Sequence, residues 1–305
     1  MAVRPTGWLR WIVLVSGIFL AATGTSCESS GENEVPRPID APDESRLPQN
    51  DQASLHELCT AQDADGVRRR LRDGADPNES VRNGWTPLMA AARVGAEECG
   101  IALLEAGADP NLQYFNGATA LVLAIASKRE SFIQLLIRNG ADVNLANSSG
   151  DAPLFVAAVH DHVNIGVMLL EAGAAIDARS GNGMTPLMIA VSRRDEEFMA
   201  LLVERGASLE IVDDLNFTAL TWAATSGEAG HVRLLTKNGA NPNHATFDAA
   251  TPLMFAAERL DYRMVEILVE AGADRKAQLI TGESAWDIAK EAGADENLLE
   301  LLDSR

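Results

Sequence analysis

The sequence is poor in cysteine, histidine and basic residues, and each shortage excludes a class of protein. Three cysteines in 305 residues, Cys27, Cys59 and Cys99, are too few for a disulfide-rich scaffold. Five scattered histidines leave little material for a metal site, and we expect neither a metal nor a cofactor. Lys and Arg number 25 against 44 Asp and Glu, a net charge of -19. That balance argues against a nucleic-acid partner, because phosphate neutralisation needs clustered basic side chains.

Catalytic motifs are missing as well. The chain has no glycine-rich phosphate loop after a strand, no Gly-x-Ser-x-Gly elbow and no His-Glu-x-x-His sequence. His160 and His162 are two residues apart, a spacing that puts side chains on different faces of a helix, so we expect surface histidines rather than shared metal ligands. The acidic runs 195–197 and 213–214 are expected to be solvated. We therefore predict that the protein is not an enzyme.

The amino terminus has the features of an export signal. Arg4 and Arg10 accompany an apolar run over residues 11–22, and small residues then lead to Cys27. The run is shorter than the roughly 20 apolar residues that span a bilayer, and it suits the hydrophobic part of a secretory signal. The stretch Gly24-Thr25-Ser26-Cys27 resembles the lipobox of bacterial lipoproteins, although that family usually has Leu where Gly24 stands. The resemblance implies a signal peptide over residues 1–27 and lipidation of Cys27.

The segment after Cys27 fits a lipoprotein. Residues 28–52 are acidic and proline-rich without helical or strand periodicity, which predicts a disordered acidic tether. Glu28 is not the Asp linked to inner-membrane retention in the resembled lipoproteins, so the outer membrane is slightly favoured. We expect a lipid-anchored protein on the periplasmic face of the cell envelope. Two alternatives stay open: ordinary cleavage near residues 22–26, giving a soluble periplasmic or secreted protein, and an uncleaved anchor.

A 33-residue period organises the rest of the chain. Glycines followed by Ala recur at this step at Gly74, Gly107, Gly140, Gly173, Gly206, Gly239 and Gly272. Tripeptides of the Thr-Pro-Leu type begin at Thr86, Thr119, Ala152, Thr185, Thr218 and Thr251. A third series is Ala91, Ala124, Ala157, Ala190, Ala223, Ala256 and Ala289. Three registers that stay locked over about seven periods indicate a repeat architecture.

The residue types have physical reasons. A Thr such as Thr86 can cap a helix start through its hydroxyl, and Pro87 stands where its missing N–H costs nothing. Leucine pairs such as Leu103-Leu104 provide a buried stripe on a second helix. Gly107 and its equivalents can adopt the left-handed conformation that ends that helix.

The period and the Thr-Pro-Leu pattern resemble the ankyrin repeat. The resemblance covers residues 53–305 and implies an all-α repeat solenoid of helix-turn-helix units joined by β-turns or hairpins, as a monomer. We count about 7–8 units including caps, with bounds near 53–78, 79–111, 112–144, 145–177, 178–210, 211–243, 244–276 and a cap over 277–305.

The sequence departs from the family pattern at several positions. The family's His after Leu is kept only at His56, and the equivalent residues are Met89, Val122, Phe155, Met188, Thr221 and Met254. Ala152 lacks a capping hydroxyl, which predicts a weaker helix start. The glycine that precedes the Thr-Pro-Leu series is replaced by Asn216 and Ala249, so those two turns are expected to differ.

Cys59 and Cys99 fall on apolar positions of a leading and a trailing helix, and we interpret them as buried thiols. Export permits a disulfide, but the two register positions are not obvious neighbours, so no bridge is expected. The basic run over 68–72 is interpreted as a solvated helix face, with contact to lipid headgroups as an alternative.

Aromatic residues make up 5% of the chain, and several gather near the expected turn tips, the surface that ankyrin repeats typically use for binding. The candidate partner-binding residues are Trp85, Tyr114, Phe115, Phe217 and Phe247. They are either anchors for a partner or side chains that pack one turn on the next. Trp222 and Phe255 lie on first helices and are expected to pack in the core.

Seven of the acidic and four of the basic residues precede residue 53, which leaves a net charge of -16 on the rest. Such a surface favours a basic partner. The leading hypothesis is a non-catalytic protein–protein interaction module, a scaffold or adaptor, displayed on the envelope side of a bacterial membrane. The alternative is an inhibitor or immunity-type protein that neutralises a basic enzyme or toxin. Some exported bacterial ankyrin proteins accompany redox enzymes, which is a further option by resemblance.

Overall fold

The computed structural model describes residues 53–303, which form two compact units. We call residues 53–181 the N-terminal unit and residues 182–303 the C-terminal unit. The expected signal peptide, the lipidation site Cys27 and the expected tether over 28–52 lie outside the described residues.

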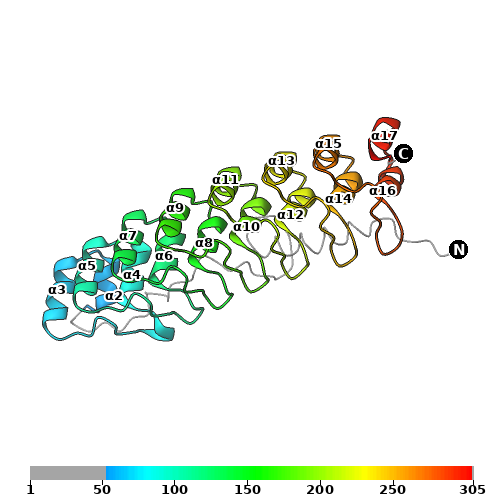
Figure 1. The fold of residues 1–305 in the computed structure, drawn as a ribbon. Helices are drawn as coiled ribbons and strands as arrows, with labels where there is room; N and C mark the ends of the chain where they lie inside the picture. The colour runs from blue at the N-terminus through cyan, green and yellow to red at the C-terminus, as the bar shows by residue number, and fades with distance from the viewer. Residues whose placement is uncertain (1–52, 304–305) are drawn as a thin grey trace. The chain divides into compact units, whose positions relative to one another are not determined.

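Each unit is a row of short helix pairs joined by extended loops (Figure 1). The N-terminal unit contains α2 (Leu55–Thr60), α3 (Ala64–Arg72), the 3-10 helix η2 (Arg82–Gly84), α4 (Pro87–Val94), α5 (Glu97–Glu105), α6 (Ala120–Ala126), α7 (Glu130–Arg138), α8 (Pro153–Val159) and α9 (Val163–Glu171). The C-terminal unit contains α10 (Pro186–Arg193), α11 (Glu196–Glu204), α12 (Ala219–Ser226), α13 (Ala229–Lys237), α14 (Pro252–Glu258), α15 (Tyr262–Glu270), α16 (Ala285–Ala292) and α17 (Glu296–Leu302).

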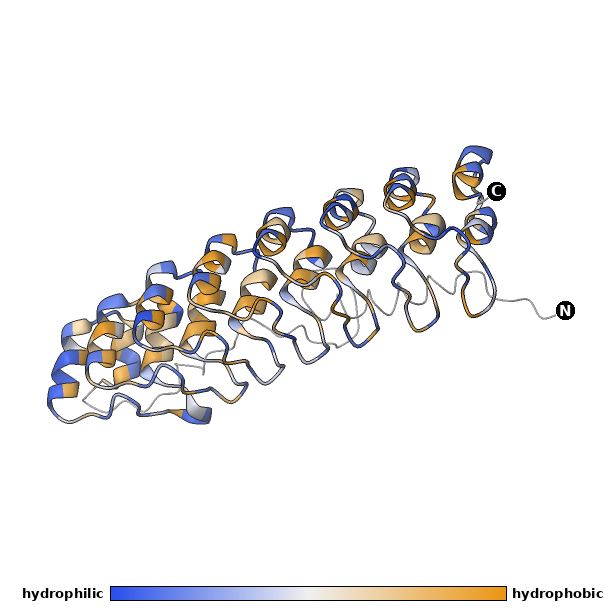
Figure 2. Cartoon of the chain, viewed as in Figure 1, coloured by the Kyte–Doolittle hydropathy of each residue, from blue (hydrophilic) through white to orange (hydrophobic). Residues whose placement is uncertain are grey.

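Helices of the same kind pack on one another from repeat to repeat. First helices pack in the orders α2–α4–α6–α8 and α10–α12–α14–α16, and second helices do the same in α3–α5–α7 and α11–α13–α15–α17. Hydrophobic residues lie mainly along the helices (Figure 2). Each unit therefore has a continuous core between its two rows of helices, and each repeat depends on its neighbours to cover it.

The recurring residues form the core as expected. The whole alanine series that begins at Ala91 is buried, which lets neighbouring first helices approach closely. In each leucine pair one residue is fully buried and keeps the 33-residue step, as Leu103, Leu136 and Leu169 do. The residues that replace the family's His, from Met89 to Met254, are buried as well, so apolar packing takes the place of a polar network at most of these positions.

The helix ends confirm the assigned roles of Thr and Gly. The hydroxyl of Thr86 accepts a hydrogen bond from Met89 N at 3.3 Å, whereas Ala152 makes no side-chain cap, as expected. Gly107 has φ 90, and its equivalents lie between 85 and 94. A β-carbon on Gly107 would meet no atom within 4 Å, so glycine is required there by its backbone conformation and not by crowding.

Four asparagines at the same register each tie a turn to the next repeat. Asn111 Nδ2 donates to the Gly140 carbonyl oxygen at 3.0 Å, and Asn111 Oδ1 accepts from Asp142 N at 2.7 Å. The same two bonds, reaching 29 and 31 residues ahead, are made by Asn78, Asn144 and Asn243. Packing of helices is thus reinforced by polar bonds along the loop side.

The turns at Asn216 and Ala249 do not differ from the others in the way we expected. Both residues have φ 62, the left-handed conformation that Gly117 (φ 78) and Gly150 (φ 79) adopt in the same register. Asn tolerates this region, whereas Ala adopts it at a cost, because its β-carbon approaches the next carbonyl oxygen. The repeat imposes the turn even where the local residue opposes it.

Within residues 53–303, no helix combines the length and the apolar character needed to cross a membrane.

Candidate protein-binding surface

The loop between successive helix pairs ends in a tight reversal that presents one side chain outward. At residues 114–118, Tyr114 N donates to the Ala118 carbonyl oxygen at 2.9 Å, and Gly117 N donates to the Tyr114 carbonyl oxygen at 2.7 Å. The same two bonds recur over 246–250 and over 279–283. Because the backbone groups are paired, the second residue of each turn is free to point into solvent.

Three large apolar side chains occupy this second position. Phe115 is 66% exposed, Phe247 is 73% exposed and Ile280 is 67% exposed. Phe247 and Ile280 are in successive turns of the C-terminal unit. A hydrogen bond from Ile280 N to the Asp248 carbonyl oxygen at 3.2 Å joins these two turns. We call Phe247 and Ile280 the tip pair. Sequence reasoning missed Ile280, because only aromatic residues were considered, although its register is that of Phe247.

Three of the five candidate binding residues are buried. Trp85 and Phe217 are each 2% exposed, and Tyr114 is 6% exposed. The Trp85 and Tyr114 rings meet edge to face at 5.2 Å, and Tyr114 meets Phe115 in the same way at 4.5 Å. The turns are therefore stabilised by the buried side chains of Trp85, Tyr114 and Phe217. Of the five candidates, only Phe115 and Phe247 have side chains that a partner could contact.

A buried carboxylate supports the aromatic cluster of the C-terminal unit. Trp222 and Phe255 pack in the core as expected, and the Phe217 ring lies 5.6 Å from Trp222 and 5.9 Å from Phe255. Asp213, which we expected to be solvated, is only 5% exposed. Its Oδ2 accepts from Trp222 Nε1 at 2.8 Å, and its Oδ1 accepts from Leu215 N and Phe217 N at 2.9 Å. Burial raises the pKa of Asp213, and these hydrogen bonds oppose the rise.

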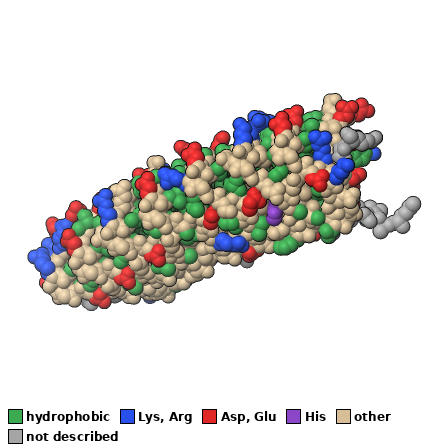
Figure 3. All heavy atoms as spheres, viewed as in Figure 1, with side chains coloured by type: hydrophobic (Ala, Val, Ile, Leu, Met, Phe, Trp, Pro, Cys, Tyr) green, Lys and Arg blue, Asp and Glu red, His purple; other side chains and the backbone are tan. Residues whose placement is uncertain are grey.

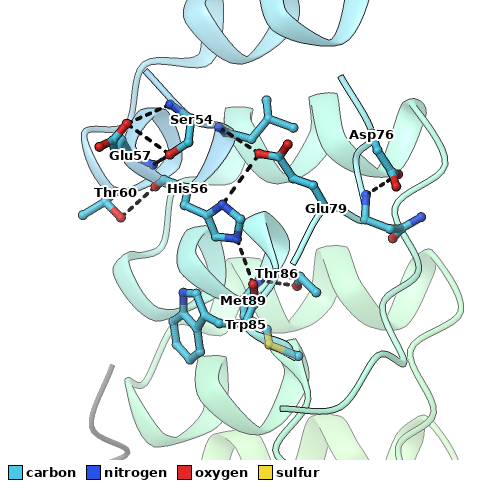
Figure 4. Close-up of polar contacts among 11 residues, drawn as sticks. Ser54, His56, Glu57, Thr60, Asp76, Glu79, Trp85, Thr86 and Met89 are labelled. Atoms are coloured by element: carbon cyan, nitrogen blue, oxygen red, sulfur yellow. Dashed lines mark hydrogen bonds and ion pairs between the residues drawn. The ribbon is translucent and has the colours of Figure 1, made fainter. Parts of the chain in front are cut away.

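The histidine that keeps the family pattern closes the first repeat (Figure 4). His56 is buried, and its Nε2 lies 2.8 Å from the Trp85 carbonyl oxygen, while its Nδ1 lies 3.7 Å from Glu79 Oε1. Glu79 also accepts from Leu55 N at 3.3 Å. Burial lowers the pKa of His56 despite the carboxylate nearby. Its role is to join the first repeat to the loop of the second.

His160 and His162 do not point to different sides, as a helical spacing would require. They flank a left-handed residue, Asp161 (φ 55), between α8 and α9, and their rings stack with centroids 5.6 Å apart. Burial, and secondly the neighbouring His160, lower the pKa of His162. No group of three or more potential metal ligands occurs within residues 53–303.

A shallow hollow of about 360 Å³ is lined by Gly95, Glu97, Lys128, Arg129, Glu130 and Ser131. Its two basic and two acidic side chains offset one another. The Ser131 hydroxyl donates a hydrogen bond to Glu97, but every side chain of the lining is exposed or half-buried, so water solvates the pair. This arrangement lacks the convergent groups that a catalytic site needs.

Charged side chains are interspersed along the face drawn in Figure 3. The basic run of α3 is partly neutralised, because Arg68 lies 2.6 Å from Glu98 of α5 and 3.4 Å from Asp65. Arg68 therefore joins two neighbouring second helices and does not present a bare cation.

Comparisons with known proteins agree with this architecture. A family model described as ankyrin repeats (3 copies) matches residues 55–147, 102–180, 168–246 and 212–279. The crystal structure of the ankyrin repeat domain of Bcl-3, described as a unique member of the IkappaB protein family, is similar with a TM-score of 0.67 and 26% identity, covering 72% of this chain and 99% of that one. The human ASB11 ankyrin repeat domain is similar with a TM-score of 0.62 and 28% identity, covering 72% and 99%. A comparison with curated proteins gave no match.

The matched residues span more than half of the chain, and the helix pairs, capped Thr starts and left-handed glycines agree with them. The ankyrin repeat domain is a non-catalytic binding fold, typically a module for protein–protein interaction. This chain belongs to the ankyrin-repeat family.

Proposed function

We propose that this protein is a scaffold or adaptor that binds another protein through the exposed residues of its turns. The observation that carries the proposal is the tip pair, Phe247 and Ile280, two large apolar side chains that are 73% and 67% exposed on adjacent, hydrogen-bonded turns. Exposed apolar side chains on a rigid frame lose little conformational freedom on binding, and such residues often dominate interface energies. Phe115, held by Tyr114, provides a comparable contact on the N-terminal unit.

A double variant tests this function. Phe247→Ser with Ile280→Ser in the full chain should reduce recovery of the partner, captured by affinity purification after cross-linking, by about tenfold or more. Glu266→Ala, an exposed change on α15, is the matched control and should retain the partner. If the double variant and the control recover equal amounts of the partner, the tip pair is not part of the binding surface.

We further propose that the protein is displayed on the envelope side of a bacterial membrane through a lipid on Cys27. The support is in the sequence: an apolar run over 11–22, a lipobox-like Gly24-Thr25-Ser26 and an acidic stretch over 28–52. Cys27→Ala should move the protein from the membrane fraction to the soluble fraction and abolish incorporation of labelled fatty acid. A variant that stays bound to the membrane argues for an uncleaved anchor.

The acidic charge favours a second candidate, an inhibitor or immunity-type protein that occludes a basic enzyme or toxin. A net charge of -16 from residue 53 onward would accelerate encounter with a cationic protein. This candidate predicts association with one basic partner whose rate falls steeply as ionic strength rises. A salt-independent association rate would favour a general adaptor.

A further inference from the structure

Two cysteines that the sequence separates by 40 positions meet in the core of the N-terminal unit. Cys59 lies in α2 and is 0% exposed, and Cys99 lies in α5 and is 1% exposed. Both are free thiols, and the Cys59 thiol donates a hydrogen bond to the Cys99 sulfur. The expectation that these positions are not neighbours was wrong.

The repeat geometry explains the contact. Cys59 is in the first helix of one repeat, and Cys99 is near the start of the second helix of the next repeat. Helix α2 packs on α4, and α4 packs on α5, so the two cysteines lie on helices that share α4 as a neighbour. The two cysteines are therefore diagonal neighbours, at different register positions of successive repeats.

We propose that Cys59 and Cys99 are a redox-active pair that a small-molecule disulfide, such as oxidised glutathione, converts into a disulfide bond joining the first repeat to the second. A disulfide bond forms only between cysteines that lie close together, and these two thiols interact within one core. These are the only cysteines of the described residues, and no competing thiol lies in the same core.

The environment distinguishes the two thiols. The hydrogen bond from Cys59 lowers the pKa of Cys99, and the nearby cation Arg68 acts in the same direction, whereas burial and the carboxylates of Asp63 and Glu98 oppose it. The hydrogen bond and burial raise the pKa of Cys59. Cys99 is therefore the thiol that more readily forms the attacking thiolate.

The reaction balances in two exchange steps. The Cys99 thiolate attacks one sulfur of the oxidant RSSR, forms a mixed disulfide and releases RS⁻, which takes up a proton. Cys59 then loses its proton, attacks the Cys99 sulfur and displaces the second RS⁻. In sum, two protein thiols and RSSR give one protein disulfide and two RSH, so the protein pair is oxidised by two electrons and the oxidant is reduced.

The oxidant reaches the buried pair when α2 opens. This helix has six residues and is the first of the described helices, packed on α3 and α4. Terminal elements with few neighbours open more readily than the centre of a core. Once formed, the bond restrains α2, because a cross-link limits the opened state more than the closed one.

The full chain carrying Cys27→Ala, which leaves only this pair, provides the test. After incubation with oxidised glutathione without denaturant, we expect both thiols to disappear together, and mass spectrometry should find one intramolecular link between the peptides containing Cys59 and Cys99. Adding Cys59→Ala should leave a stable glutathione adduct on Cys99. Thiols that stay free, or separate adducts on both cysteines of the unlinked parent, would overturn the proposal.

A second measurement does not depend on substituting either residue of the pair. Hydrogen exchange in Leu55–Thr60 should be at least about tenfold slower after oxidation than after reduction with dithiothreitol. Exchange over Ala285–Ala292 is the internal control and should not change with redox state. Equal exchange in Leu55–Thr60 in the two states would contradict a cross-link that holds α2.

Discussion

The carboxylate of Asp213 accepts a hydrogen bond from the indole nitrogen of Trp222 at 2.8 Å inside the C-terminal unit. The same carboxylate accepts two backbone N–H groups of its own turn. One buried side chain thus connects a turn that carries Phe217 to the helix behind it. Because a buried donor without an acceptor is costly, the integrity of this turn depends on the charge and the shape of a single residue.

Asp213→Asn should destabilise the protein by about 1–3 kcal/mol, because the amide keeps an acceptor for the backbone but turns an N–H₂ group toward the indole N–H. Urea unfolding followed by circular dichroism measures the change. Asp214→Asn, an exposed substitution in the same turn, is the control and should change stability by less than about 0.5 kcal/mol. Similar losses of unfolding free energy in the two variants would show that the hydrogen bond between Asp213 and Trp222 does not contribute to stability.

Ala249→Gly should stabilise the protein by about 0.5–1 kcal/mol, since glycine removes the left-handed strain that alanine bears at φ 62. The reverse change at the same register, Gly150→Ala, should cost about 1–3 kcal/mol, because the new β-carbon would lie 2.7 Å from Gly181 N. Thermal unfolding of the two variants should move the midpoint in opposite directions. A lower midpoint for Ala249→Gly would mean that the turn is not strained.

Acidification should weaken the first repeat through His56. Burial lowers the folded-state pKa of His56 below its ordinary 6.5, so the unfolded chain binds more protons as pH falls through this region. The stability that neutral His56 contributes is fully present above about pH 6.5 and is lost as pH falls toward the folded-state pKa. Urea midpoints at pH 7.5 and pH 5.5 measure the loss.

His231 and His162 also have lowered pKa values and add to the same pH dependence. His56→Gln should therefore reduce the difference between the two midpoints without removing it. An unchanged difference would show that His56 takes no part in the acid response.

Asn111→Ala should destabilise the protein by about 1–2 kcal/mol, because it removes two hydrogen bonds to the following repeat, each worth about 0.5–1 kcal/mol at an exposed position. Asn111→Asp keeps the acceptor for Asp142 N but loses the donor to Gly140, so we expect about half of that loss. Differential scanning calorimetry of the two variants checks the order. Ser148→Ala, an exposed change in a neighbouring turn, is the control.

Periodicity made most of the fold predictable. Thr86, Ala91 and Gly107 have equivalents in most repeats, where they begin a helix, allow a close helix contact and end a helix, so their spacing alone identified the architecture. The same register placed five candidate residues near the turn tips, of which Phe115 and Phe247 are exposed and Trp85, Tyr114 and Phe217 are buried.

Contacts that break the register could not be predicted in this way. Cys59 meets Cys99 along a diagonal between repeats, and Asp213 is buried because Trp222, present in only one repeat, provides a donor for it. His160 and His162 stack because the chain turns at Asp161, where a continuous helix would separate them. Each of these depends on one side chain and not on the repeat.

The asparagine series also bears on how the protein comes into being. Asn78 needs Gly107 and Asp109 to complete its turn, and Asn111 needs Gly140 and Asp142. A ribosome produces these acceptors and donors later than the asparagines, so ordered structure must lag about one repeat behind the growing end of the nascent chain. A polypeptide released early would end in a loop whose asparagine lacks its partners, and quality-control proteases could cleave the chain at that loop.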